Sequence, residues 1–106
     1  MVEVTNDTFR KNPSLCIPRV NKDIKWIDVK NVFSKLFDVK LIDRIDVIDK
    51  KDFKRVFIHF KYWPDTEEVK VLKEHLIKYN EFRVVYEYPH YWKCYISRVA
   101  KPRRKK

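Results

Sequence analysis

The chain contains no glycine and a single alanine, Ala100, among its 106 residues. Glycine is the usual residue where the backbone needs a positive φ, so such turns must here use Asn, Asp or Lys. Lys, Ile, Asp and Val are abundant instead. Because Gly and Ala have GC-rich codons, this composition indicates an AT-rich coding sequence.

Cysteine is also scarce, with only Cys16 and Cys94, far apart in the chain. The sequence has no C-x-x-C pair, so it predicts no zinc site or other metal site. We expect no disulfide, with Cys94 facing the core and Cys16 facing away from it. Residues 1–7 do not resemble a signal peptide, and no apolar run approaches membrane-spanning length. We therefore expect an intracellular protein with reduced thiols and no membrane partner.

Positive charge is in clear excess, with 25 Lys and Arg against 15 Asp and Glu, giving a net charge of +10. Five of the cations lie in the last six residues: Lys101, Arg103, Arg104, Lys105 and Lys106. Like charges repel, so we expect residues 101–106 to form a disordered basic tail that contacts nucleic acid or another polyanion. A solubilising end or a nuclear address is the alternative interpretation.

The length and composition predict one folded domain. Hydrophobic residues make up 44% and aromatics 15% of the chain, enough to build a single core. Residues 1–13 are polar and end in Asn12-Pro13. We therefore predict an extension over 1–13, a domain over 14–100 and the tail over 101–106.

Two helices are predicted from apolar residues that recur every three or four positions. The first runs from 27 to 37, with Val29, Val32, Phe33, Leu36 and Phe37 on one side. The second begins at Asp65 as N-cap, with Glu68 completing a capping box, and ends at Tyr79 before Asn80. Its apolar stripe is Val69, Leu72, Leu76 and Tyr79.

The remaining segments predict strands. Residues 15–17 form a short strand that ends or bulges at Pro18. Segments 41–48 and 54–62 make an antiparallel hairpin, and 82–86 with 92–98 make a smaller one. The order β-α-β-β-α-(β)-β predicts an α+β fold, a two-layer α/β sandwich of ferredoxin-like topology with an extra hairpin strand before the last strand. Both helices would cover one face of the sheet, leaving the other open.

Residues 55–60 show strict period-two alternation, typical of a strand with one buried face. Val56, Ile58 and Phe60 point one way, while Arg55, Phe57 and His59 point the other. A cation and flat rings on an open face suit single-stranded nucleic acid. Cover by a second layer is the alternative.

The segment Phe57-Ile58-His59-Phe60 matches the second half of the octapeptide K/R-G-F/Y-G/A-F-V-x-F/Y, and on this basis residues 14–102 resemble the RNA-recognition-motif family. The combination of Ser14-Leu15-Cys16-Ile17-Pro18-Arg19-Val20 with Arg55-Val56-Phe57-Ile58-His59-Phe60 is similar to small RNA-recognition-motif-like proteins of large cytoplasmic DNA viruses. The resemblance implies the ferredoxin-like fold and single-stranded RNA as partner. It also implies the host cytoplasm or the virion as location, with the nucleus as another possibility.

The chain departs from that family at several positions. Phe53, Lys54, Arg55 and Val56 do not match the first half of the octapeptide, and Cys16 stands where an aromatic ring is usual. Arg55 can replace a ring, because a guanidinium stacks on bases. Tyr95, if it faces outward, supplies a second platform beside Cys16. Asp46 on the same face would repel phosphate.

Other chemistry is weakly indicated. No motif places a Ser, Cys or carboxylate beside His59, so we predict no enzymatic activity, cofactor or small-molecule substrate. Asp43, Asp46 and Asp49 alternate sides of a strand and cannot converge on a metal ion. The aromatic cluster Tyr86, Tyr88, Tyr91 and Trp92 is either a protein-binding patch or packing around the small hairpin.

The sequence thus predicts a non-enzymatic nucleic-acid-binding module, with RNA favoured. Base stacking and phosphate contacts would come from Arg55, Phe57, His59, Tyr95, Lys93 and the tail cations Lys101, Arg103, Arg104, Lys105 and Lys106. The alternative is a protein-interaction or virion-structural module of the same fold with a degenerate RNA face.

Overall fold

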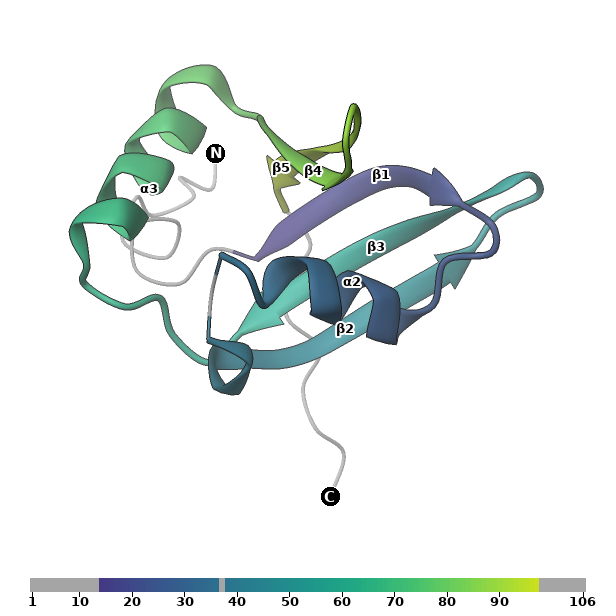
Figure 1. Ribbon diagram of the computed structural model, residues 1–106, viewed down its shortest axis with the longest axis horizontal. Coiled ribbons are helices and arrows are strands. Elements are labelled where there is room, and N and C mark those ends of the chain that lie inside the picture. The colour runs from purple at the N-terminus through teal and green to yellow at the C-terminus, as the bar shows by residue number, and fades with distance from the viewer. Residues whose placement is uncertain (1–13, 37, 98–106) are drawn as a thin grey trace, which may run out of the picture.

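The protein is an α+β fold with one five-stranded antiparallel sheet and two helices (Figure 1). The computed structural model describes residues 14–36 and 38–97. The elements in chain order are β1 (Leu15–Asn21), α2 (Trp26–Phe33), the 3-10 helix η1 (Val39–Leu41), β2 (Ile42–Asp49), β3 (Phe53–Phe60), α3 (Glu67–Tyr79), β4 (Phe82–Glu87) and β5 (His90–Ile96). The strand order is β2-β3-β1-β5-β4. The predicted combination of two helices with a mainly antiparallel sheet is confirmed.

The core lies on one face of the sheet. Val56, Ile58 and Phe60 of β3 are all buried, as the alternation in this strand predicted. They join one cluster with Leu15 and Ile17 of β1, Val29 and Phe33 of α2, and Val69 and Leu76 of α3. Because both helices contribute to this cluster, both lie on the same side of the sheet. Each such side chain contributes about 1.5–3 kcal/mol when it is fully buried.

The pairing of β1 with β3 is irregular at Pro18. β1 pairs antiparallel with β3, and the register shifts between Ile17 and Val20. Pro18 lies in this bulge, since it has no N–H to donate to a neighbouring strand. The strand therefore bulges at Pro18 and continues to Asn21. Beside the bulge, the Arg19 guanidinium lies 4.1 Å from the centre of the Phe53 ring.

Helix α2 is shorter than the predicted span of 27–37. It ends at Phe33, and the next residues form a turn in which the Leu36 N–H donates to the Phe33 carbonyl at 2.9 Å. Leu36 is 50% exposed, so its place in the helical apolar pattern does not lead to burial.

The start of α3 also differs from the prediction. Thr66 is the N-cap residue, and its Oγ1 accepts a hydrogen bond from the Val69 N–H at 3.3 Å. Asp65, predicted as the cap, lies one residue earlier and its carboxylate is 3.6 Å from Lys70 Nζ. Both side chains can cap a helix, and the local pattern did not distinguish them.

The end of α3 is as predicted in one respect and different in another. Asn80 has a φ of 61°, so it ends the helix in the left-handed conformation that glycine usually takes. Tyr79, predicted on the buried stripe, is 58% exposed and lies beside His75.

The last two strands form the predicted smaller hairpin, with β4 at the edge of the sheet. β5 joins the rest of the sheet through two pairs, Leu15 with Ile96 and Cys16 with Tyr95. Trp92 is only 5% exposed and stacks on Tyr86 at 4.6 Å. Trp92 is therefore part of the hydrophobic core and not of an exposed partner-binding patch.

Candidate nucleic-acid interface

A row of four side chains crosses the sheet on the face opposite the two helices. The strand registers pair Asp46 of β2 with Phe57 of β3, Phe57 with Cys16 of β1, and Cys16 with Tyr95 of β5. Paired residues in antiparallel strands point to the same face. All four side chains are half-buried. Phe57 and Tyr95, predicted to act together, thus lie on either side of Cys16.

Cationic side chains lie around this row. Arg55 is half-buried and stands two residues before Phe57, so both share a face. Lys93 is exposed and stands two residues before Tyr95, so these two side chains also share a face. These predicted site residues, Arg55, Phe57, Tyr95 and Lys93, are brought to one face.

A further residue of this face, Arg83, was missed by sequence reasoning. Arg83 of β4 pairs with Lys93, and its guanidinium lies 4.8 Å from the centre of the Tyr91 ring. Period-two alternation places Arg83 on one face of its strand. Only the hairpin register shows that this is the face of Lys93 and Tyr95.

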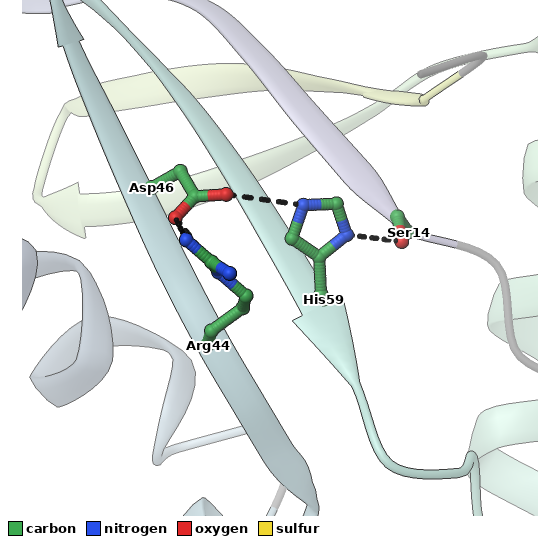
Figure 2. A network of polar contacts seen from close by, with 4 residues as sticks. All are labelled: Ser14, Arg44, Asp46 and His59. Atoms are coloured by element: carbon green, nitrogen blue, oxygen red, sulfur yellow. Dashed lines mark hydrogen bonds and ion pairs between the residues drawn. The ribbon is translucent and has the colours of Figure 1, made fainter. Parts of the chain in front are cut away.

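His59 does not offer the exposed ring that was predicted for it. Its side chain is only 1% exposed, which excludes base stacking on its ring. Both ring nitrogens have polar partners (Figure 2): Ser14 Oγ lies 2.7 Å from His59 Nδ1, and Asp46 Oδ2 lies 3.4 Å from Nε2. The imidazole is thus held between β1 and β2.

Arg44 completes this network. Its Nε and Nη2 donate to Asp46 Oδ1 at 2.9 and 2.7 Å, so one carboxylate oxygen faces Arg44 and the other faces His59. The predicted repulsion of phosphate by Asp46 is offset by the Arg44 guanidinium beside it. Two opposite charges in contact largely cancel each other's effect on a group farther away.

Ser14, His59 and Asp46 contact one another in that sequence, and these are the residue types of a serine hydrolase triad. Their spacing in the chain gave no sign of this. Two features of the geometry do not suit that chemistry. The serine lies on Nδ1 and the carboxylate on Nε2, the reverse of the hydrolase arrangement. The buried ring is also closed to a substrate. We interpret the network as one that positions three strands, and the absence of enzymatic activity stays a prediction.

The two ring nitrogens of His59 contact different groups, Nδ1 the Ser14 hydroxyl and Nε2 the Asp46 carboxylate. A hydroxyl can donate or accept, so the Ser14 contact suits either state of Nδ1. These contacts around a buried ring favour one strand alignment, because a shifted strand would leave the imidazole without its polar partners.

Both thiols are held in the neutral form. Burial raises the pKa of Cys16, and the positive charge of Arg55 opposes this effect in part. Burial also raises the pKa of Cys94, with a smaller contribution from Cys16. Cys94 is fully buried on the core side and Cys16 half-buried on the other face, as predicted, and both are free.

The remaining predicted site residues divide into two groups. Tyr88 and Tyr91 are 88% and 40% exposed, whereas Tyr86 is half-buried against Trp92. The tail residues Lys101, Arg103, Arg104, Lys105 and Lys106 lie outside the described residues, as do the segments 1–13 and 101–106.

Within residues 14–36 and 38–97, three or more His, Cys, Asp or Glu side chains nowhere gather as a metal site would require. No helix in this part of the chain has the length and apolar character needed to cross a membrane. Comparisons with protein families, with curated proteins and with solved structures return no match to the chain.

Proposed function

We propose that the chain is a non-enzymatic nucleic-acid-binding module, with single-stranded RNA as the favoured ligand. The observation that carries this proposal is the row in which Phe57 and Tyr95 flank Cys16 on the sheet face away from the helices. Two rings in one row of an antiparallel sheet, separated by the small Cys16 side chain, provide platforms for one or two bases.

The topology supports a ferredoxin-like, RNA-recognition-motif-like assignment. Without the additional edge strand β4, the order is β2-β3-β1-β5, with the first and third strands in the centre. This order places Cys16 and Phe57 side by side in the middle of the sheet, where the family resemblance expects base contacts. A viral origin and a host-cell or virion location rest on the same resemblance.

The charges around the row supply the electrostatic part of binding. Arg55 and Lys93 lie beside the two rings, and Arg44 offsets Asp46. The tail cations would add phosphate contacts that do not depend on base identity. Stacking contributes roughly 1–3 kcal/mol per base, and the electrostatic remainder weakens as salt rises. Few side chains on this face can read base edges, so weak sequence specificity is expected.

The test is fluorescence-anisotropy titration of a mixed-sequence single-stranded RNA at two salt concentrations. Phe57→Ala should weaken binding roughly fivefold to a hundredfold, equivalent to the loss of one stacking contact. A chain ending at Ala100 should bind more weakly and show a flatter salt dependence.

Tyr79→Ala provides the matched control, because Tyr79 is an exposed ring on α3, away from the row. It should leave binding unchanged. If Phe57→Ala and Tyr79→Ala bind equally well, and only the tail deletion matters, the sheet face does not bind RNA. The chain is then better explained as a protein-interaction or virion-structural module.

The alternative has one specific observation in its favour. Tyr88 is 88% exposed at the hairpin turn, and Val85 and Tyr91 nearby are 52% and 40% exposed. Exposed apolar and aromatic groups of this kind are typical of protein-binding surfaces.

A further inference from the structure

The outer face of β5 alternates aromatic rings with a cation. Tyr91, Lys93 and Tyr95 occupy every second position of the strand, so their side chains point to the same side. The residues between them, Trp92 and Cys94, are buried in the core. Because Tyr95 belongs to the row of the candidate interface, the same face continues from that row along β5 into the β4–β5 hairpin.

The edge strand β4 widens this face with a second cation. Arg83 pairs with Lys93, and paired residues of antiparallel strands point to the same side. Val85 pairs with Tyr91 in the same way, and both pairs come before the register shift that follows Val85. All four side chains are exposed, with Tyr91 at 40%. The two charged residues among them are both cations, so positive charge lies beside an accessible ring.

Arg83 and Tyr91 form one stacked unit. The Cζ atom of Arg83 lies 4.8 Å from the centre of the Tyr91 ring. This cation–π contact holds the long arginine side chain near the ring, so less of its conformational freedom is lost when a ligand binds. A guanidinium beside an aromatic ring offers flat surfaces for a base and N–H donors for a phosphate. The hairpin therefore supplies both kinds of contact that single-stranded nucleic acid uses.

We propose that the β4–β5 hairpin extends the RNA site, with the Tyr91–Arg83 pair as a further stacking platform for the same single strand. This inference rests on the proposed function. Tyr91 lies four positions from Tyr95 along β5, roughly 13 Å at the usual rise of an antiparallel strand. Lys93 stands midway, where it meets the phosphates between the two stacked bases. The site then takes a longer strand than the one or two bases that Phe57 and Tyr95 hold.

The test is fluorescence-anisotropy titration of a single-stranded RNA of about 10 nucleotides, within the site sizes of open single-strand-binding surfaces. Tyr91→Ala should weaken binding roughly fivefold to a hundredfold, equivalent to the loss of one stacking contact. Tyr91→Phe keeps the ring and should bind like the wild type. Tyr88→Ala is the matched control, because Tyr88 is an 88% exposed ring in the turn of the same hairpin. It should leave the affinity unchanged.

The charge of the hairpin is tested separately. Arg83→Gln should weaken binding and lower the salt dependence by about one phosphate contact. Lys70→Gln removes the same charge from α3, on the helix side of the sheet, and should leave the affinity and the salt dependence nearly unchanged. The RNA should bind once per chain, because one strand spans the row and the hairpin. Circular dichroism checks that each variant is folded.

Phe57→Ala, measured on the same RNA, separates this inference from the proposed function. If Phe57→Ala weakens binding and Tyr91→Ala does not, the hairpin lies outside the site, and the inference fails while the proposed function stands. Equal losses for Tyr91→Ala and Tyr88→Ala, a Tyr91→Phe variant as weak as Tyr91→Ala, or two RNA strands per chain would also overturn it. If Phe57→Ala has no effect, the proposed function fails, and the inference fails with it.

Discussion

His59 in β3 and Ser14, the residue before β1, are joined by a contact of 2.7 Å between Nδ1 and Oγ. The two residues are 45 positions apart in the chain, and the imidazole is 1% exposed. Asp46 on the other side of the ring extends the network to β2. Polar contacts on the face away from the helices thus link β3 to β2 and to the start of β1.

Ser14→Ala should lower the free energy of unfolding by about 1–2 kcal/mol, because it removes a hydrogen bond to a buried ring. Urea denaturation measures the change. Ser34→Ala is the control, since Ser34 Oγ donates to the Asn31 carbonyl at an exposed position. Its cost should be under about 0.5 kcal/mol. An equal loss of unfolding free energy in the two variants would show that the Ser14–His59 contact does not add to stability beyond an exposed hydrogen bond.

Arg44 and Asp46 should have opposite effects on RNA binding if the sheet face binds RNA. Asp46→Asn removes a negative charge beside Phe57 and should tighten binding about two- to fivefold, the range of a partly exposed charge interaction. Arg44→Gln should weaken it by a similar factor. Asp49→Asn is the control, because Asp49 is 83% exposed at the far end of β2. Anisotropy at low salt measures all three, and an equal gain from Asp46→Asn and Asp49→Asn would indicate only net charge.

Stability should fall at alkaline pH through Cys94. Its pKa is raised in the folded protein above the ordinary 9.0, so the unfolded chain loses the thiol proton first. The stabilising effect is present in full below pH 9 and is lost as pH rises above it, by about 1.4 kcal/mol per pH unit for one proton.

Urea denaturation from pH 7 to 10.5 measures this loss. Cys94→Ala removes the thiol, so its free energy of unfolding should decline less steeply above pH 9, whatever the cost of the substitution at neutral pH. Parallel curves for the variant and the wild type would show that Cys94 does not account for the alkaline loss.

The first turn of α3 should depend on Thr66 and not on Asp65. Thr66→Ala removes the hydrogen bond to the Val69 N–H and should cost about 1 kcal/mol. Asp65→Ala removes an exposed contact with Lys70 and should cost less than about 0.5 kcal/mol. Thermal denaturation compares the two variants, and the reverse ranking would restore Asp65 as the cap.

Local patterns predicted the elements well where the pattern itself has a single physical meaning. Alternation in 55–60 gave the buried face of β3, and Asn80 ended a helix in a chain without glycine. The same patterns failed at Leu36 and Tyr79, which continue an apolar period but are exposed. Periodicity describes one segment, whereas burial depends on whether another segment covers it.

The sequence by itself determined the kinds of elements, the buried side of β3 and the excess of positive charge, because these depend on neighbouring residues and on composition. The tertiary structure decided which residues meet. Ser14, Asp46 and His59 come together through the pairing of β1 and β2 with β3, and Phe57 and Tyr95 come together through β1. Strand pairing joins segments far apart in the chain, and its register is set by packing of the common core, which no local pattern records.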